Sequence, residues 1–243
     1  MKTALITGAS GSIGSACAEI FVKNGYFTAG TYNTGEKKAF ELKRRMGEHG
    51  ELFYPVQADL SDYGGAQAAY DYVKNNFGHA DVLVYCAGAE LYKLAQETAG
   101  SELERIMNVN FNSAYLLSSL CLKDMTERKS GSIVFVSSIW GARGASMESA
   151  YSASKAALIG LTKSLAKEAG PSGVRINCVC PGATDTKMLA RFSAEELADV
   201  IERTPLGRLG TPSEMAELIY FLASEKAGFI TGQSIVADGG FIL

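Results

Sequence analysis

Short apolar segments alternate with longer amphipathic ones along the whole chain. Short apolar runs bounded by turn residues predict buried β-strands, whereas apolar residues recurring every three or four positions predict helices. The predicted strands are Thr3–Thr7, Tyr26–Tyr32, Glu51–Gln57, Val82–Tyr85, Ser132–Ser137, Arg175–Val179 and Ser234–Ala237. The predicted helices between them are Gly14–Asn24, Lys37–His49, Gly65–Phe77, Leu103–Met125, Ser152–Ala169 and Pro212–Ala223.

The repeated strand–helix–strand order predicts the class of the fold. Strands separated by helices pair in parallel through right-handed crossovers, and several of these strands are apolar on both faces, as a sheet covered by helices requires. We therefore expect one α/β domain over residues 1–243, with a doubly wound, mostly parallel seven-stranded sheet and helices on both faces. Residues 184–205 interrupt the alternation, and we expect them to form a helical flap over the substrate.

The composition is that of a globular chain. Of its 243 residues, 47% are hydrophobic and 20% are charged, which suffices for a sizeable core and excludes disorder. A net charge of −3 gives no reason to expect nucleic acid or an anionic membrane as a partner. No apolar stretch approaches the roughly 18 residues of a membrane helix. The five cysteines form no paired framework, which is typical of the reducing cytoplasm, and we expect no metal site.

A glycine-rich turn joins the first predicted strand to the first predicted helix. It reads Thr7-Gly8-Ala9-Ser10-Gly11-Ser12-Ile13-Gly14. Glycine allows positive φ angles and a close approach of the backbone to a ligand, and the free N–H groups of a helix start attract anions. At the first strand–helix junction of an α/β fold, such a turn predicts a site for the pyrophosphate of a dinucleotide.

The end of the second predicted strand bears on the choice of dinucleotide. A carboxylate about 20 residues past the glycine-rich turn holds the ribose of NAD. Here the strand ends in Tyr32-Asn33-Thr34 without an acid, and Lys37 and Lys38 follow. An uncharged pocket near two cations accepts a 2′-phosphate better than an aspartate does, so NADP(H) is favoured over NAD(H).

Tyr151 and Lys155 form the first candidate for chemistry. Four residues apart, they lie on one face of a predicted helix, where an ammonium group near a phenol lowers a phenol pKa that starts near ~10. Such a phenol can protonate a ketone oxygen near neutral pH. Ser138 ends an apolar strand thirteen residues earlier, at the sheet edge where ligands bind in open α/β folds, and its hydroxyl can bond the same oxygen.

Further motifs follow the strand ends in a fixed order. They are Asp59-Leu60, Ala87-Gly88, Asn110, Pro181-Gly182, and Ile230–Gln233 with Asp238–Gly240. Together with the glycine-rich turn, Ser138, Tyr151 and Lys155, they resemble the short-chain dehydrogenase/reductase family over essentially the whole chain. The resemblance implies a Rossmann-type fold and hydride transfer between a nicotinamide cofactor and a carbonyl group.

The resemblance also implies roles for single residues. Tyr151 is expected to be the general acid/base, and Ser138 to orient the substrate carbonyl. Lys155 is expected to lower the pKa of Tyr151 and to bind the nicotinamide ribose, while Asn110 holds a water that relays protons to Lys155. The implied cofactor-binding residues are Gly8, Ser10, Gly11, Ser12, Ile13, Gly14, Tyr32, Asn33, Thr34, Asp59, Leu60, Ala87, Gly88, Tyr151, Lys155, Pro181, Gly182, Thr184 and Thr186.

Two positions depart from the family pattern. Ser12 stands where compact members usually carry glycine, and its hydroxyl is expected near a phosphate. Cys86 replaces the asparagine of an Asn-Ala-Gly motif, and we interpret it as a small buried residue rather than a nucleophile.

Two substrate classes remain open from the resemblance. The general similarity is to bacterial 3-oxoacyl-[acyl-carrier-protein] reductases, whose surface cations grip an acidic acyl carrier protein; Lys129 matches one such position, but Ser172 replaces the other. The segment Ser137–Gly141, with Trp140 and Glu148, is similar to a subgroup that reduces a 5-aminopentanone modification on elongation factor P. The substrate is therefore expected to be a small-molecule or carrier-bound ketone.

A third alternative is a non-catalytic regulator that senses NADP(H). Such a protein is expected to lose its acid/base group, whereas Ser138, Tyr151, Lys155 and Asn110 all remain. Family members are usually homotetramers built through two long helices and the last strand. The resemblance implies the same assembly here, since the two long helices carry enough apolar residues for such faces.

Overall fold

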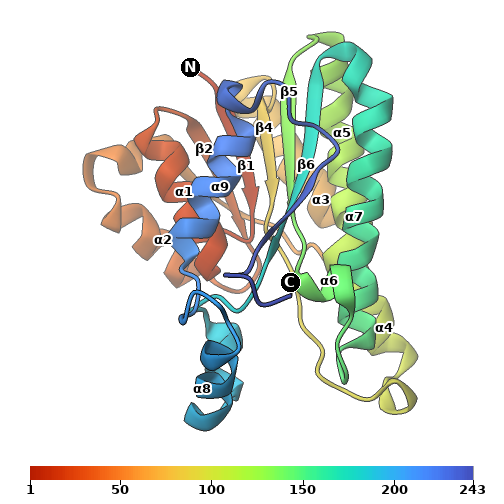
Figure 1. The fold of residues 1–243 in the computed structure, drawn as a ribbon. Helices are drawn as coiled ribbons and strands as arrows, with labels where there is room; N and C mark the ends of the chain where they lie inside the picture. The colour runs from red at the N-terminus through yellow and green to blue at the C-terminus, as the bar shows by residue number, and fades with distance from the viewer. Residues whose placement is uncertain (243) are drawn as a thin grey trace.

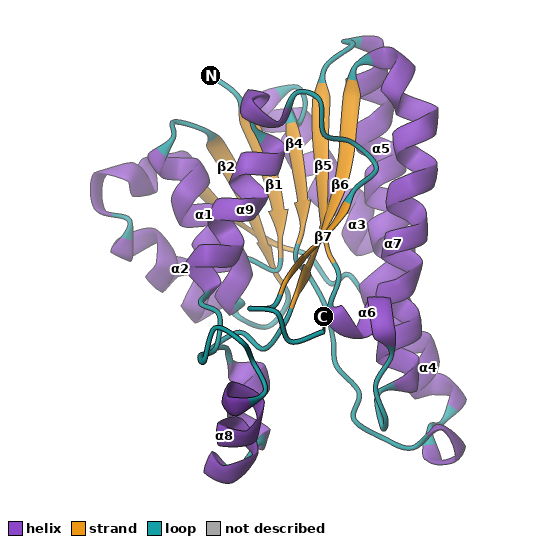
Figure 2. Ribbon diagram, in the orientation of Figure 1, coloured by secondary structure: helices purple, strands orange, loops and turns teal. Residues whose placement is uncertain are grey.

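Seven parallel strands form one sheet in the computed structural model, which describes residues 1–242 (Figures 1 and 2). The strand order is β3-β2-β1-β4-β5-β6-β7, and every neighbouring pair is parallel. This confirms the predicted doubly wound α/β fold. The strands are β1 (Thr3–Thr7), β2 (Phe27–Tyr32), β3 (Phe53–Gln57), β4 (Val82–Tyr85), β5 (Gly131–Val136), β6 (Val174–Pro181) and β7 (Ser234–Ala237).

Helices cover both faces of this sheet. The α-helices are α1 (Ser12–Lys23), α2 (Glu36–Arg45), α3 (Tyr63–Phe77), α4 (Gly100–Met107), α5 (Ser113–Glu127), α6 (Ile139–Arg143), α7 (Ser149–Ala169), α8 (Ala194–Glu202) and α9 (Pro212–Ala223). Figure 2 shows α1 and α9 on one face and α3, α5 and α7 on the other. Among residues 1–242, no helix combines the length and apolarity needed to cross a bilayer.

The two faces of the sheet build two separate cores because side chains alternate along each strand. Leu5 of β1 belongs to the core that includes residues of α3, α5 and α7, whereas its neighbours Ala4 and Ile6 belong to the core that includes residues of α1 and α9. In β5, Phe135 belongs to the same core as Leu5, and Val134 belongs to the same core as Ala4 and Ile6. Strands with apolar residues on both faces therefore belong to a sheet covered by helices on both sides, as the sequence predicted.

Three segments differ from the sequence prediction. The single helix expected over Leu103–Met125 is interrupted by a π-helical turn, η3 (Asn108–Asn112), which joins α4 to α5. The short helix α6 was not predicted. The start of the third predicted strand instead belongs to a 3₁₀ turn, η1 (Gly47–Leu52), because the sheet pairing begins only at Phe53.

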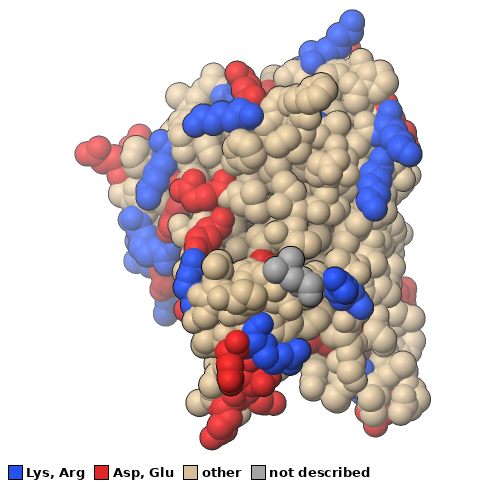
Figure 3. Space-filling model, in the orientation of Figure 1, with Lys and Arg blue, Asp and Glu red and all other residues tan. Residues whose placement is uncertain are grey.

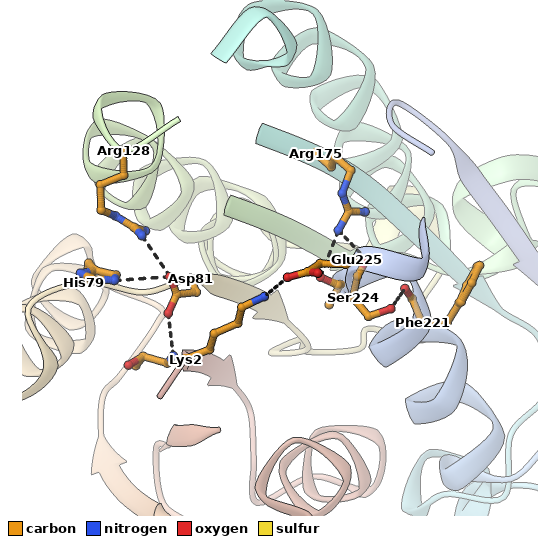
Figure 4. Close-up of polar contacts among 10 residues, drawn as sticks. Lys2, His79, Asp81, Arg128, Arg175, Phe221, Ser224 and Glu225 are labelled. Atoms are coloured by element: carbon orange, nitrogen blue, oxygen red, sulfur yellow. Dashed lines mark hydrogen bonds and ion pairs between the residues drawn. The ribbon is translucent and has the colours of Figure 1, made fainter. Parts of the chain in front are cut away.

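A network of polar side chains joins the amino ends of the strands, at the edge of the sheet where the chain begins (Figure 4). Asp81 accepts hydrogen bonds from the Thr3 backbone N–H at 2.8 Å and from Arg128 at 3.0 Å. Lys2 pairs with Glu225 at 2.6 Å, but both side chains are more than half exposed, so this pair contributes little.

Arg175 ties the end of α9 to the sheet. Its guanidinium donates to the carbonyl oxygens of Ala223 at 3.0 Å, Ser224 at 2.9 Å and Ala227 at 3.1 Å, and also to Leu222. The last carbonyls of a helix have no partner within the helix, and a cation there also favours the helix dipole. Burial lowers the pKa of Arg175, yet its five donors let one side chain cap this helix.

We expect Arg175→Met to lower the free energy of unfolding by about 2 kcal/mol, because it leaves several partly buried carbonyls unpaired. Lys2→Met, which removes only the exposed ion pair in the same region, is the matched control and is expected to cost less than about 0.5 kcal/mol. Urea unfolding of both variants measures the difference. Equal stabilities of the two variants would contradict this account of α9.

Candidate active site

A cleft of ≈ 790 Å³ lies at the carboxyl ends of the strands. The strand order reverses between β1 and β4, and such a reversal opens a crevice in a doubly wound sheet. Residues 184–205 contain the 3₁₀ turn η5 (Lys187–Arg191) and the helix α8. Figure 1 shows α8 beyond the carboxyl ends of the strands. Met188, Leu189, Phe192 and Leu197 of this segment line the cleft.

The glycine-rich turn forms the floor of one end of the cleft. Gly8 has φ +68°, and a Cβ on Gly14 would overlap the Gly8 carbonyl, with the Gly8 carbonyl carbon only 2.7 Å away. Helix α1 starts after Gly11 without a side-chain cap, so its first N–H groups are available to a ligand. This cradle fits the pyrophosphate of a dinucleotide, which binds where backbone donors and the helix dipole converge.

The residues expected at the adenosine end lie next to this turn. Tyr32, Asn33, Asp59 and Leu60 line the cleft. Asp59 accepts hydrogen bonds from the N–H and the hydroxyl of Ser61 at 2.9 and 2.8 Å, which lower its pKa and keep it ionised. An ionised carboxylate at this place can accept a hydrogen bond from an adenine amino group.

Tyr151 and Ser138 meet at the other end of the cleft. Tyr151 lies in the first turn of α7, and Ser138 precedes α6, where its oxygen accepts a hydrogen bond from the Trp140 N–H at 3.2 Å. Burial raises the pKa of Tyr151 to about 12, and a hydrogen bond with Ser138 partly opposes this shift. The phenol therefore holds its proton at neutral pH, with the Ser138 hydroxyl beside it.

The lowered Tyr151 pKa that was expected is not found in this structure, where burial outweighs any effect of Lys155. Lys155 is 4% exposed, and its ammonium donates to the Val136 carbonyl at 2.9 Å rather than to the phenol. It lies 5.8 Å from the centre of the Tyr151 ring. Burial lowers the pKa of Lys155 to about 8. The helix thus brings amine and phenol together, but desolvation governs both pKa values.

Asn110 lies behind the cleft rather than in it. It is fully buried in the π-helical turn η3, where its amide accepts from the Ala89 N–H at 2.7 Å and donates to the Ala89 carbonyl at 3.0 Å. It also donates to the Ser154 hydroxyl at 2.8 Å. A Cβ on Gly88 would lie 3.2 Å from the Lys155 amine and 3.6 Å from the Asn110 oxygen. The observed bonds of Asn110 therefore brace the Ala89 backbone beside Lys155.

Two carboxylates and one arginine line the cleft beside the flap segment. Arg191 of η5 donates to Glu148 at 2.8 Å and to Glu90 at 2.9 Å, and its guanidinium lies 4.7 Å from the centre of the Tyr92 ring. Glu148 is 8% exposed, and burial raises its pKa although Arg191 opposes the shift. These contacts fasten the segment 187–191 to the loops after β4 and before α7.

Most residues predicted for the site line the cleft, but two do not. Thr34 is exposed outside it, and Asn110 is buried behind it. The other predicted residues, with Cys86, line it: Gly8, Ser10, Gly11, Ser12, Ile13, Gly14, Tyr32, Asn33, Asp59, Leu60, Ala87, Gly88, Ser138, Tyr151, Lys155, Pro181, Gly182, Thr184 and Thr186.

Several lining residues had no place in the predicted site, among them Arg105, Lys187, Arg191 and Phe241. No local pattern marks them, because each reaches the cleft from an element distant along the chain. Within residues 1–242, no group of three or more potential ligands gathers in a way that would hold a metal ion.

Comparison with known proteins assigns the family. A family model described as enoyl-(acyl carrier protein) reductase matches residues 8–242. The chain therefore belongs to the short-chain dehydrogenase/reductase family, as the motifs indicated, and it is an oxidoreductase of the kind that uses a nicotinamide cofactor.

Individual relatives agree over the full length. The chain is 39% identical over 244 residues to the uncharacterized oxidoreductase YmfI of Bacillus subtilis, covering 99% of this chain and 98% of the relative. It is 34% identical to the 3-oxoacyl-[acyl-carrier-protein] reductase FabG of Vibrio harveyi, covering 100% and 98%. The crystal structure of ribose-5-phosphate isomerase from Brucella melitensis superposes with a TM-score of 0.91 at 33% identity, covering 100% of this chain and 93% of that one.

We expect Gly14→Ala to weaken dinucleotide binding by at least about tenfold, because the added methyl group overlaps the Gly8 carbonyl and forces the turn to move. Gly100→Ala, whose Cβ would meet nothing within 4 Å, is the matched control and leaves the affinity unchanged. Fluorescence titration with the reduced dinucleotide measures both. Unaltered binding by the Gly14 variant would show that this turn is not the cradle.

Proposed function

We propose that the protein is an NADPH-dependent ketoreductase in which Tyr151 protonates the substrate oxygen. The proposal is carried by one observation: a buried phenol and a serine hydroxyl lie in the same cleft as the glycine-rich turn. A bound nicotinamide supplies the hydride in this chemistry. The chain's own residues then have to position the carbonyl and deliver one proton to its oxygen.

The proton delivery follows from the local geometry. Tyr151 holds its proton at neutral pH and gives it up only as negative charge develops on the carbonyl oxygen. Ser138 is placed to donate a second hydrogen bond to that oxygen, which stabilises the same charge. A protonated Lys155, 5.8 Å from the ring centre, favours the phenolate left behind. Asn110 acts through Ala89, whose backbone it fixes beside Lys155.

The preference for NADPH rests on charge at the adenosine end. No acid occupies residues 32–34, where a carboxylate would repel a 2′-phosphate. Lys38 lines the cleft, whereas Lys37, considered with it from the sequence, does not. Lys38 and the uncharged residues 32–34 at this end support NADP(H) over NAD(H).

The first candidate substrate is a 3-oxoacyl thioester on an acyl carrier protein. It is supported by the relatives named for that reaction, which match this chain from end to end. The apolar flap residues Met188, Leu189 and Phe192 offer an acyl chain an apolar surface.

The second candidate is a ketone bearing an amine, such as a 5-aminopentanone group on elongation factor P. The two carboxylates Glu90 and Glu148 carry one charge more than the single Arg191 that they share. Acidic side chains also gather over α8, at the lower end of the view in Figure 3 (Glu195, Glu196, Asp199 and Glu202). This negatively charged surface beside the cleft attracts a cationic ketone and repels an acidic carrier protein.

We further propose a homotetramer in the cytoplasm. Apolar side chains that are exposed in the monomer lie on elements that the family uses for assembly, among them Tyr115 on α5 and Val236 on β7. All five cysteines are free, which suits a reducing compartment. A regulator that only senses NADP(H) is disfavoured, since it has no use for the proton donor at Tyr151.

The test is NADPH oxidation with an acetoacetyl thioester and with a small amino ketone, measured side by side. Turnover of either by the wild type supports a ketoreductase, and the ratio of the two kcat/KM values selects the substrate class. Tyr151→Phe is expected to lower kcat by about 10³-fold or more while NADPH still binds, because only the proton donor is lost. Binding without turnover of any ketone would favour the sensor, and a fully active variant would exclude Tyr151 as the acid.

The pH dependence of ketone reduction should follow Lys155. Its pKa of about 8 means that the ammonium is present below that pH and lost above it, while Tyr151, with a pKa of about 12, stays protonated throughout. We therefore expect kcat/KM to be level in the neutral range and to fall as the pH rises through about 8. A rate that increases across this range would contradict the role of Lys155, and circular dichroism at each pH controls for unfolding.

A further inference from the structure

Two lysines from distant parts of the chain meet over the cleft. Lys38 is in the first turn of α2, and Lys187 begins η5 in the segment 184–205. Both side chains line the cleft, and they lie close enough for the charge of Lys187 to act on Lys38. This contact lowers the pKa of Lys38, as repulsion between two like charges requires. Without a bound anion, the repulsion between the two ammonium groups destabilises this arrangement of the protein.

The position of the lysine pair indicates which part of a bound dinucleotide lies beside it. Gly35, at the start of α2, abuts Ser10 of the glycine-rich turn, since a Cβ on Gly35 would lie 2.7 Å from the Ser10 side chain. Lys38 follows three residues later in α2, the helix that comes directly after β2. In the doubly wound fold this is the region of the adenosine ribose and its 2′ position.

The other charges at this end do not neutralise the pair. Arg45 is ion-paired with Glu19 at 2.7 Å, and Asp59 is held by Ser61 and lies near Arg105. Glu41, which also lines the cleft, lies 4.0 Å from Arg44. Within the described residues 1–242, neither Lys38 nor Lys187 forms an ion pair with a carboxylate.

We propose that Lys38 and Lys187 clamp the 2′-phosphate of NADP(H) between α2 and the segment 184–205. A phosphate dianion bridging two ammonium groups replaces their repulsion with two charge-assisted contacts. Because Lys187 belongs to the segment that also carries Arg191, phosphate binding draws that segment over the cleft. This inference rests on the proposed use of NADPH and assigns Lys187 as a residue that determines cofactor specificity.

The test compares the affinities of NADPH and NADH for the wild type, Lys38→Met and Lys187→Met. The single tryptophan of the chain, Trp140, lines the cleft, so quenching of its fluorescence reports binding without turnover. We expect each variant to raise the Kd for NADPH by roughly tenfold and the Kd for NADH by less than about twofold. The salt dependence of NADPH binding should become weaker in both variants, because fewer charges contact the phosphate.

Lys37→Met is the matched control, since it removes a neighbouring charge that does not line the cleft, and it should leave both affinities unchanged. An unaltered NADPH affinity in Lys187→Met overturns the clamp, even if Lys38→Met binds NADPH weakly. An equal loss of affinity for NADPH and for NADH overturns the assignment to the 2′-phosphate and indicates that the lysines contact the pyrophosphate instead. A wild type without preference for NADPH refutes instead the cofactor part of the proposed function, before any variant is considered.

Discussion

The reversal of strand order at β1 is the constraint on which the site depends. The chain first builds outward from β1 through β2 to β3 and then returns to place β4 on the other side of β1. The loops that leave β1 and β4 therefore meet: the Ala87 N–H donates to the Thr7 hydroxyl at 3.0 Å, and a Cβ on Gly8 would lie 3.0 Å from the Ala87 backbone. Only small residues fit this contact. It fixes the glycine-rich turn relative to the loop in front of Lys155, and so joins this turn to the end of the cleft that holds Ser138 and Tyr151.

Desolvation, more than the spacing of Tyr151 and Lys155, sets the chemistry at the other end. Both side chains are nearly inaccessible, and burial moves each pKa toward the value that favours its neutral form. The four-residue step on α7 explains why amine and ring lie near each other. This spacing does not determine which atom the amine faces, and the amine donates its hydrogen bond to the carbonyl of Val136 at the end of β5. The protonated phenol suits reduction of a ketone, which needs a donor, better than oxidation of an alcohol, which needs a base.

The sequence predicted the parts of the structure that local patterns control. The bounds of β1, β4 and β7 agree with the prediction, because turn residues border these apolar runs. The predicted helix over Leu103–Met125 was wrong in its middle, since apolar periodicity continues through a π-helical turn whose Asn110 is held by bonds to Ala89 and Ser154. Ser138 and Tyr151 were predictable as motifs on neighbouring elements. Arg191 was not, because its partners Glu148 and Glu90 are 43 and 101 residues away in the chain.

The charges on η5 connect the two ends of the cleft. Lys187 lies at its first residue, against Lys38 on the dinucleotide side, and Arg191 lies at its last, between Glu90 and Glu148 on the substrate side. Repulsion at the first contact disfavours closure of the segment, whereas attraction at the second favours it. An anion bound between Lys38 and Lys187 turns the repulsion at the first contact into attraction and leaves the ion pairs of Arg191 unchanged. Both contacts belong to one five-residue turn, so a group that binds at either end and shifts this turn alters the free energy of binding at the other.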